Sequence, residues 1–159
     1  QRRPGARAAP EFHVAPMVNV THRHFRQLLR LLTSRATLWT EMVKVTPRFL
    51  VDKEERLRLL DFPPEQRPLV LQLAGRDPGA LGLAAELAAP FGFSELNLNC
   101  GCPSADHGAA LMREPALAAA AVRRMAAHAR VSVKCRLAAH LPGEPTALRS
   151  EAAEYASLK

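Results

Sequence analysis

The chain has 159 residues, 48% of them hydrophobic, and 22 Lys and Arg against 15 Asp and Glu leave a formal net charge of +7. That length supports one ordinary globular core. No apolar run approaches the roughly 18 residues of a membrane-spanning helix, so the sequence excludes a membrane-spanning protein, and we expect no membrane among its partners. The basic balance is compatible with a polyanionic partner such as nucleic acid without establishing one.

The cysteines and the N-terminal residues give information on the cellular compartment. Three cysteines, Cys100, Cys102 and Cys135, are too few and odd in number for a disulfide scaffold. We therefore expect a reducing, intracellular compartment, either the cytoplasm or an organelle. Residues 1–11 are predicted to form a basic, flexible terminus, with the tail of a transit peptide as the alternative. The first residue is Gln1, which suggests a start inside a longer product.

The first half of the chain predicts two strands and one helix. We expect a short strand at 13–17 and a second at 36–45, with residues 46–67 a long, proline-punctuated loop with some helix. Thr21 is the expected cap of the helix between the strands. One face of that helix carries Phe25, Leu28, Leu29 and Leu32.

The second half alternates strands and helices more clearly. The expected strands are 69–73, 94–98 and 131–135, and a helix over 115–128 precedes the last of them. Asp77 and Pro78 form a capped start for a helix that reaches about Ala89. Residues 145–159 are expected to be helical, with a weak apolar face.

This alternation predicts an α/β fold with a parallel sheet under helices, either doubly wound or part of a barrel. About five βα units are present at most. A complete eight-stranded barrel needs about 250 residues, so the chain would hold only part of one.

Polar or turn-forming residues recur at the carboxyl ends of the expected strands, where α/β proteins bind ligands. They are Pro16, Met17 and Asn19, then Glu41, Gln72, Asn97, Asn99 and Cys102, and finally Lys134 and Arg136. Together they suggest one shared polar ligand, because a buried polar group needs a partner. Separately, Gln72 could be a hydrogen-bonding spacer between strands, and Lys134 could be a snorkelling lysine or an ion-pair partner of Glu41.

The segment Asn97-Leu98-Asn99-Cys100-Gly101-Cys102-Pro103-Ser104 is the most informative. Its two asparagines alternate and so point the same way from one strand, and Gly101 would let a ligand approach the backbone. Cys102 follows on the loop. No second Cys/His pair has metal-ligand spacing, so we expect no metal, and Cys100 and Cys135 are expected to be small buried hydrophobes.

With this motif the sequence resembles the tRNA-dihydrouridine synthases, and the subgroup that acts on D-loop uridines at positions 20 and 20a most of all. The resemblance covers roughly residues 12–137 in family order. Its motifs are Val-Ala-Pro-Met at 14–17, Thr-Glu-Met-Val at 40–43, Leu-Gln-Leu-Ala-Gly at 71–75, the 97–104 block, Ala-Ala-Leu-Met at 109–112 and Val-Lys-Cys-Arg at 133–136.

The resemblance implies an FMN-binding TIM barrel with a small helical domain, which uses NADPH to reduce uridine to 5,6-dihydrouridine in tRNA. It implies the following roles: flavin lining by Pro16, Met17 and Val18, a hydrogen bond to the ring edge from Gln72, a cation at the N1 and O2 region from Lys134, base contact by Asn99 and general acid catalysis by Cys102.

The uracil double bond gains a hydride at C6 and a proton at C5. A cysteine thiol with its usual pKa of about 8.5 is mostly protonated at neutral pH and can supply that proton. The target base must leave its stack to reach such a site. Phosphates could be held by His22, Arg23, Arg26 and Arg30, although a solvated helix face is the simpler interpretation.

Two departures from the family pattern stand out. Only three residues separate Ser104 from Gly108, so the loop beside Cys102 is short, and His107 is a remote substitute as proton donor. Nothing after Leu137 resembles the later strands or the helical domain. We therefore expect 12–137 to be the first five βα units of an FMN-binding TIM barrel, and 138–159 to be an atypical, helical tail.

Two other functions remain open. One is a catalytically inactive remnant that binds RNA or a partner protein. The other is an FMN barrel that reduces small pyrimidines, which the 97–104 block argues against. The sequence leaves the oligomeric state open.

Overall fold

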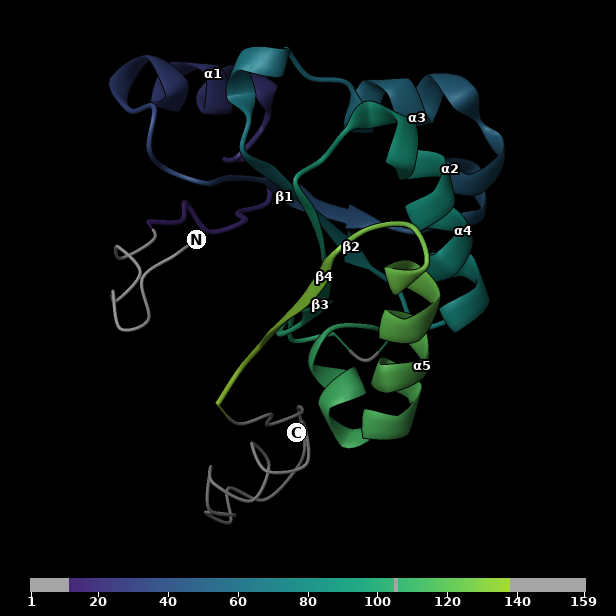
Figure 1. Cartoon of the computed structure of the whole chain (residues 1–159). Coiled ribbons are helices and arrows are strands. Elements are labelled where there is room, and N and C mark those ends of the chain that lie inside the picture. The colour runs from purple at the N-terminus through teal and green to yellow at the C-terminus, as the bar shows by residue number, and fades with distance from the viewer. Residues whose placement is uncertain (1–11, 105, 138–159) are drawn as a thin grey trace, which may run out of the picture.

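The computed structural model describes residues 12–104 and 106–137. Its elements are α1 (Arg23–Leu32), β1 (Leu38–Lys44), α2 (Pro47–Val51), α3 (Lys53–Leu60), η1 (Pro64–Gln66), β2 (Leu69–Ala74), α4 (Pro78–Ala88), η2 (Ala89–Phe91), β3 (Glu95–Cys100), η3 (Ala109–Arg113), α5 (Pro115–Ala126) and β4 (Val131–Cys135) (Figure 1). The expected flexible terminus at 1–11 and the expected tail at 138–159 lie outside the described residues.

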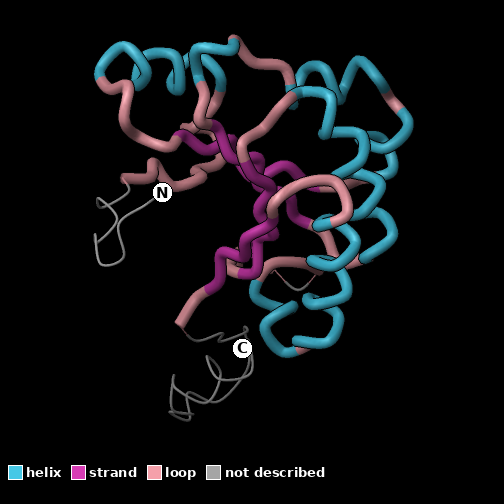
Figure 2. The backbone as a smooth tube through the Cα atoms, viewed as in Figure 1, coloured by secondary structure: helices cyan, strands magenta, loops and turns pink. Residues whose placement is uncertain are grey.

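The four strands form one parallel sheet in the order β1-β2-β3-β4. Helices α2 to α5 all lie on the same side of it (Figure 2). A doubly wound sheet reverses its strand order and carries helices on both faces. Strands that advance in one direction, with right-handed crossovers, place every crossover helix on one face and build a barrel wall. The fold is therefore a part of a TIM barrel.

The apolar core lies between this sheet and its helices. Leu71 and Leu73 of β2 and Leu96 and Leu98 of β3 are at most 2% exposed and contact the helices. Alanines on α4 and α5 let the two helices approach closely, and a Cβ on Gly82 would lie 3.0 Å from Cβ of Arg124. With the apolar side chains directed to the helices, the alternate residues of these strands face the other side of the sheet.

The expected first strand at 13–17 is wrong. His13 makes one isolated parallel bridge with Thr37, and the described residues contain four strands instead of five. Pro16 has no N–H to donate to a ladder. Directly after it, the N–H groups of Val20 and Thr21 donate to the carbonyl oxygen of Met17, which turns the chain away from the sheet.

Helix α1 also differs from the prediction. Its cap is His22, whose Nδ1 accepts from the N–H of Phe25 at 3.3 Å, while the Thr21 hydroxyl bonds back to Met17. Leu28 and Leu32, placed on the buried face by their spacing, are 52% and 74% exposed. The residue that α1 buries is Arg26 instead.

Residues 46–67 are more helical than expected. Two short helices fill most of the segment because each has a side-chain cap: Thr46 accepts from Phe49 N, and Asp52 accepts from the N–H groups of Glu54 and Glu55. Phe49 and Leu60, from α2 and α3, reach the core. No helix among the described residues is long and apolar enough to cross a membrane.

Candidate functional site at the carboxyl end of the sheet

Three carboxamides connect β2 and β3 on the face away from the helices. Gln72 Nε2 donates to Asn97 Oδ1 at 2.8 Å, and Gln72 Oε1 accepts from Asn99 Nδ2 at 2.9 Å. All three side chains are buried. The two asparagines thus point the same way, as their alternation predicts. Gln72 therefore acts as a hydrogen-bonding spacer between strands, which is one of the two roles that the sequence left open.

The hydrogen bonds continue beyond the carboxamides at both ends. Asn97 Nδ2 donates to Ser132 Oγ at 2.9 Å, and the Ser132 hydroxyl donates to Glu95 Oε1. At the other end, Asn99 Oδ1 accepts from the backbone N–H of Gly101 at 3.1 Å and of Cys102 at 2.9 Å. One row of side chains therefore runs from Glu95 to the backbone of Cys102, and we call it the amide row.

The loop after β3 closes tightly on Cys102. The carbonyl oxygen of Cys102 accepts from Ser104 N and from Ala109 N, both at 2.8 Å. Gly108 has a φ of 66°, and a Cβ there would lie 2.3 Å from that oxygen. By contrast, a Cβ on Gly101 meets nothing closer than 3.5 Å. The loop therefore requires a glycine at 108, a position that the sequence interpretation did not single out.

The three thiols lie in different surroundings. Burial raises the pKa of the Cys100 thiol to about 12, and the nearby Cys135 adds to the effect. These two residues pair across β3 and β4 and pack toward the helices. Cys102 is half-buried on the loop. Of the three, Cys102 is the thiol at the carboxyl edge of the sheet.

The remaining candidate residues spread along the same edge. Lys134 is the register partner of Asn99, so it shares the face of the amide row, and it is exposed. Pro16 is half-buried, and Met17 and Val18 are 40% and 55% exposed. This turn is tied to β1, because the N–H of Asn19 donates to Glu41 Oε1 at 2.6 Å.

Glu41 therefore faces Asn19 and does not pair with Lys134. Their strands, β1 and β4, are the two outer strands of the sheet. Lys134 lies two strands across from Gln72 and two residues farther along, so with about 4.8 Å between strands and about 3.3 Å per residue their backbones are about 12 Å apart. The structure brings Gln72, Asn99 and Cys102 into one bonded cluster, with Lys134 beside it and the Pro16 turn at the far edge.

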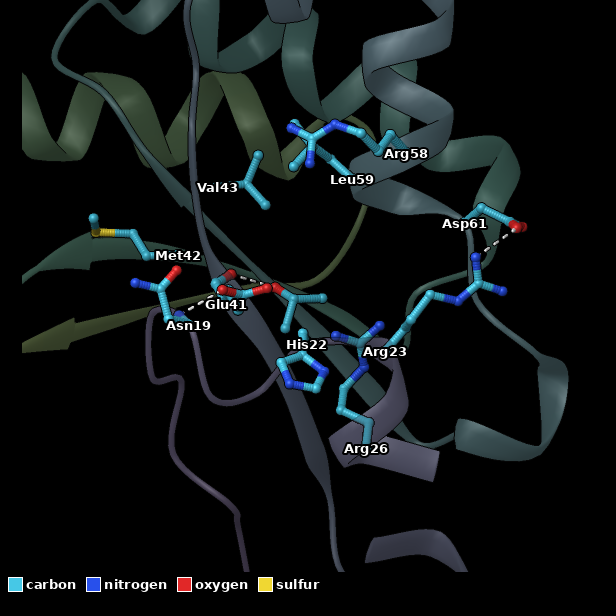
Figure 3. Close-up of a pocket in the computed structure, with 11 residues that line it drawn as sticks. Asn19, His22, Arg23, Arg26, Glu41, Met42, Val43, Arg58, Leu59 and Asp61 are labelled. Atoms are coloured by element: carbon cyan, nitrogen blue, oxygen red, sulfur yellow. Dashed lines mark hydrogen bonds and ion pairs between the residues drawn. The ribbon is translucent and has the colours of Figure 1, made fainter. Parts of the chain in front are cut away.

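A separate cavity of about 350 Å³ opens at the end of β1, between α1 and α3 (Figure 3). Glu41 and Arg58 line it, together with Arg23 and Arg26. Burial lowers the pKa of Arg26 to about 10, although Glu41 acts in the opposite direction. Its guanidinium is tied to Gln66 Oε1 at 2.9 Å and to the carbonyl oxygen of Thr21 at 2.7 Å. Arg26 is therefore part of the packing and not a solvated phosphate contact.

The side chain of Arg30 is likewise hydrogen-bonded within the fold. Its guanidinium donates to the carbonyl oxygens of Thr33, Ala36 and Gln66, each at 3.0 Å. Both arginines hold α1 in place, so of the basic residues that the sequence suggested for α1, the exposed ones are His22 and Arg23.

His107 belongs to the Cys102 loop and is buried. Its Nδ1 lies 3.2 Å from Ser104 Oγ, while its Nε2 is buried with no hydrogen-bond partner. Burial lowers the pKa of His107, Lys44 lowers it further and Asp106 opposes them. A neutral imidazole is therefore favoured. Across residues 12–104 and 106–137, no group of three His, Cys, Asp or Glu side chains could hold a metal ion.

A family profile described as Dihydrouridine synthase (Dus) matches residues 13–154. The chain belongs to the dihydrouridine synthase family. The match extends past Arg136, the last residue of the motifs quoted above.

Named relatives of the dihydrouridine synthase family agree. A tRNA-dihydrouridine(20/20a) synthase of Xanthomonas axonopodis pv. citri is 48% identical over 137 residues, which are 82% of this chain and 40% of the relative. The protein of the same name from Synechocystis is 43% identical over 131 residues, 78% of this chain and 38% of the relative. This chain spans about 40% of the length of these curated relatives.

Dihydrouridine synthases are flavin-dependent, and the side chains at this edge fit such a group. The exposed Lys134 supplies a cation on the face of the amide row, and exposed Met17 supplies apolar surface at the same end of the sheet. Gln72 is less accessible to a flavin, since it is 1% exposed. Its Nε2 carries two hydrogens and uses one of them on Asn97, so one donor remains for a ligand.

Our sequence interpretation missed Ser132 and Glu95. Both lie on the periodicity that it used, because polar residues recur at every second position, at 95, 97 and 99 on β3 and at 132 and 134 on β4. Extending the alternation toward the amino end of each strand would have placed both residues on the face of the amide row.

Proposed function

We propose that the protein is a tRNA-dihydrouridine synthase that reduces uridine to 5,6-dihydrouridine in the D-loop of tRNA, with NADPH as reductant and FMN as cofactor. The observation that carries the proposal is the hydrogen bond from the backbone N–H of Cys102 to Asn99 Oδ1. It lies at the carboxyl edge of the sheet, where Lys134 is on the same face as Asn99. The names of the relatives support the tRNA substrate.

In this proposal Cys102 is the general acid. Its thiol gives a proton to C5 of the uracil, and bound flavin supplies the hydride for C6. Asn99 has one Nδ2 hydrogen left for the base, because the other donates to Gln72. The closed loop between Cys102 and Gly108 limits where the thiol can lie.

Five residues would hold the cofactor. Pro16, Met17 and Val18 would line it, Gln72 would donate its remaining N–H, and the Lys134 ammonium would balance negative charge on the reduced ring. Since the target base must leave its stack, we also expect the enzyme to bind tRNA through basic surface and to unstack one uridine.

Flavin content and dihydrouridine formation test the proposal. We expect the purified protein to be yellow and its flavin absorbance to bleach with NADPH. Cys102→Ala should abolish dihydrouridine formation in tRNA and leave flavin bound. Cys135→Ala is the matched control, because that thiol faces the helices. Equal turnover by the parent protein and the Cys102→Ala variant would refute the assignment of Cys102 as the general acid.

Cofactor residues are tested separately. Lys134→Ala and Gln72→Ala should each lower flavin occupancy, and full occupancy in both would refute their placement. A colourless protein that retards tRNA at low salt would instead favour an RNA-binding module without flavin. Reduction of free pyrimidines but not tRNA would favour a small-molecule reductase.

A further inference from the structure

We propose that Asn97 and Ser132, with Glu95 behind them, position Cys102 through a one-way row of hydrogen bonds. Neither of the first two residues is assigned to the cofactor or the base. The inference rests on the proposed function, since positioning matters only if Cys102 reacts.

The backbone of the Cys102 loop sets the direction of the amide row from one end. Backbone N–H groups only donate, so the acceptor for Gly101 and Cys102 must be the oxygen of Asn99. The Asn99 nitrogen then has to donate to Gln72 Oε1. With its oxygen so used, Gln72 can offer only Nε2 to Asn97.

Glu95 sets the same direction from the other end. An ionised carboxylate only accepts, and Arg130 Nε lies 3.1 Å from Glu95 Oε2. The Ser132 hydroxyl must therefore donate its hydrogen to Glu95. Its oxygen is then left to accept from Asn97 Nδ2, which turns the Asn97 oxygen toward Gln72.

Both ends thus demand the same orientation of all three carboxamides. Turning any one of them would place two donors or two acceptors face to face. The three carboxamides are buried, with Gln72 and Asn97 1% exposed and Asn99 8% exposed, while Ser132 and Glu95 are half-buried. Such a mismatch is costly when buried, so the row resists it cooperatively.

The structural consequence appears at the Cys102 loop. If Asn99 turned, its NH₂ group would face the N–H groups of Gly101 and Cys102, and both would lose their acceptor. The loop would then leave its closed conformation. Ser132 lies on β4, and its side chain connects to this loop through Asn97, Gln72 and Asn99, so it is a positioning residue.

The test replaces Ser132 by Ala in the purified protein and follows alkylation of Cys102 by iodoacetamide, quantified at that residue by mass spectrometry. Losing the hydroxyl removes the anchor at the Glu95 end and leaves the backbone of the Cys102 loop alone to hold the carboxamides in their orientation. We therefore expect Cys102 to react about threefold faster or more, because thiol reactivity follows local exposure. Ser94→Ala is the matched control. Its Oγ also bonds within the sheet, accepting from Leu69 N at 3.2 Å, but lies outside the amide row.

Ser132→Thr keeps a hydroxyl and should restore the parent alkylation rate. Equal Cys102 alkylation in Ser132→Ala and Ser94→Ala, or failure of Ser132→Thr to restore the rate, would overturn the proposal. In turnover assays Ser132→Ala should lower kcat about threefold or more and leave KM for tRNA and flavin content unchanged. A parent protein that forms no dihydrouridine would refute the proposed function, while the alkylation contrast would still report on the amide row.

Discussion

Gly108 determines the shape of the loop beside Cys102 through the absence of a single atom. With a φ of 66° it lies in the left-handed region, and its backbone approaches both the carbonyl and the amide nitrogen of Cys102. Pro103 and Gly108 form an antiparallel bridge across the loop. Cys102 is therefore restrained by the backbone of its own loop as well as by Asn99.

Replacing Gly108 by Ala should destabilise the protein by about 2 kcal/mol or more, because the added methyl would need both a strained φ and a shift of the Cys102 backbone. The melting temperature measures this loss. Gly75→Ala is the control, since a Cβ there meets only ordinary contacts at 3.4 Å and beyond. A similar melting temperature for both variants would contradict the requirement for glycine at 108.

His107 makes stability depend on pH in a defined direction. Burial lowers its pKa below the usual 6.5. The unfolded chain then binds a proton more readily than the folded one, so the free energy of unfolding falls as the pH drops below about 6.5. We expect His107→Asn to show a shallower fall between about pH 6.5 and 5, measured by urea denaturation. Above about pH 7 the two curves should run parallel; parallel curves throughout would refute the assignment.

At the scale of elements, α1 is anchored by polar contacts. Gln66 of η1 is fully buried, accepts from Arg26 Nε, and donates through Nε2 to the carbonyl oxygen of Arg23 and to Gln27 Oε1. Apolar periodicity predicts a buried leucine face for such a helix, but tertiary contacts with η1 override it here. Sequence spacing reveals neither the partner of Arg26 nor its burial.

Gln66→Ala should lower the free energy of unfolding by about 1–3 kcal/mol, because it leaves the buried guanidinium of Arg26 without its side-chain acceptor. Chemical denaturation measures the loss. Glu65→Ala, at the exposed neighbouring position of η1, should change stability by less than about 0.5 kcal/mol. Equal effects at the two positions would show that Gln66 does not anchor α1.

The remaining elements followed the sequence closely. Strands were expected at 69–73, 94–98 and 131–135 and are observed at Leu69–Ala74, Glu95–Cys100 and Val131–Cys135. Helix α4 begins where Asp77 caps it, and its Oδ1 accepts from Ala80 N at 2.6 Å. These elements could be predicted because their signals are local: apolar runs for buried strands, and a cap followed by proline for helix starts.

For the whole molecule, the one-sided placement of helices leaves the other face of the sheet as the inner wall of a barrel, and the proposed site lies on it. The net charge of +7 is compatible with the polyanionic substrate of the proposed function. Because Arg26 and Arg30 are used in packing, charge count alone overstates the basic surface available to RNA.

The proposed function predicts that the protein binds tRNA with an affinity that weakens steeply with salt. The logarithm of the association constant should fall linearly with the logarithm of salt concentration, by about 0.7–0.9 for each phosphate neutralised. Filter binding over a range of salt concentrations measures the slope. An affinity independent of salt would contradict recognition through phosphates.

The amino-acid order alone was sufficient for the parallel α/β architecture, the shared face of Asn97 and Asn99 and the position of Cys102 just past a strand. Each follows from periodicity or from neighbours along the chain. Folding in three dimensions was needed to show that Arg26 is buried, that the Cys102 loop requires a glycine at 108, and that Ser132 connects to Cys102. Those features depend on contacts between residues more than twenty positions apart or on a backbone angle, and no local pattern encodes either.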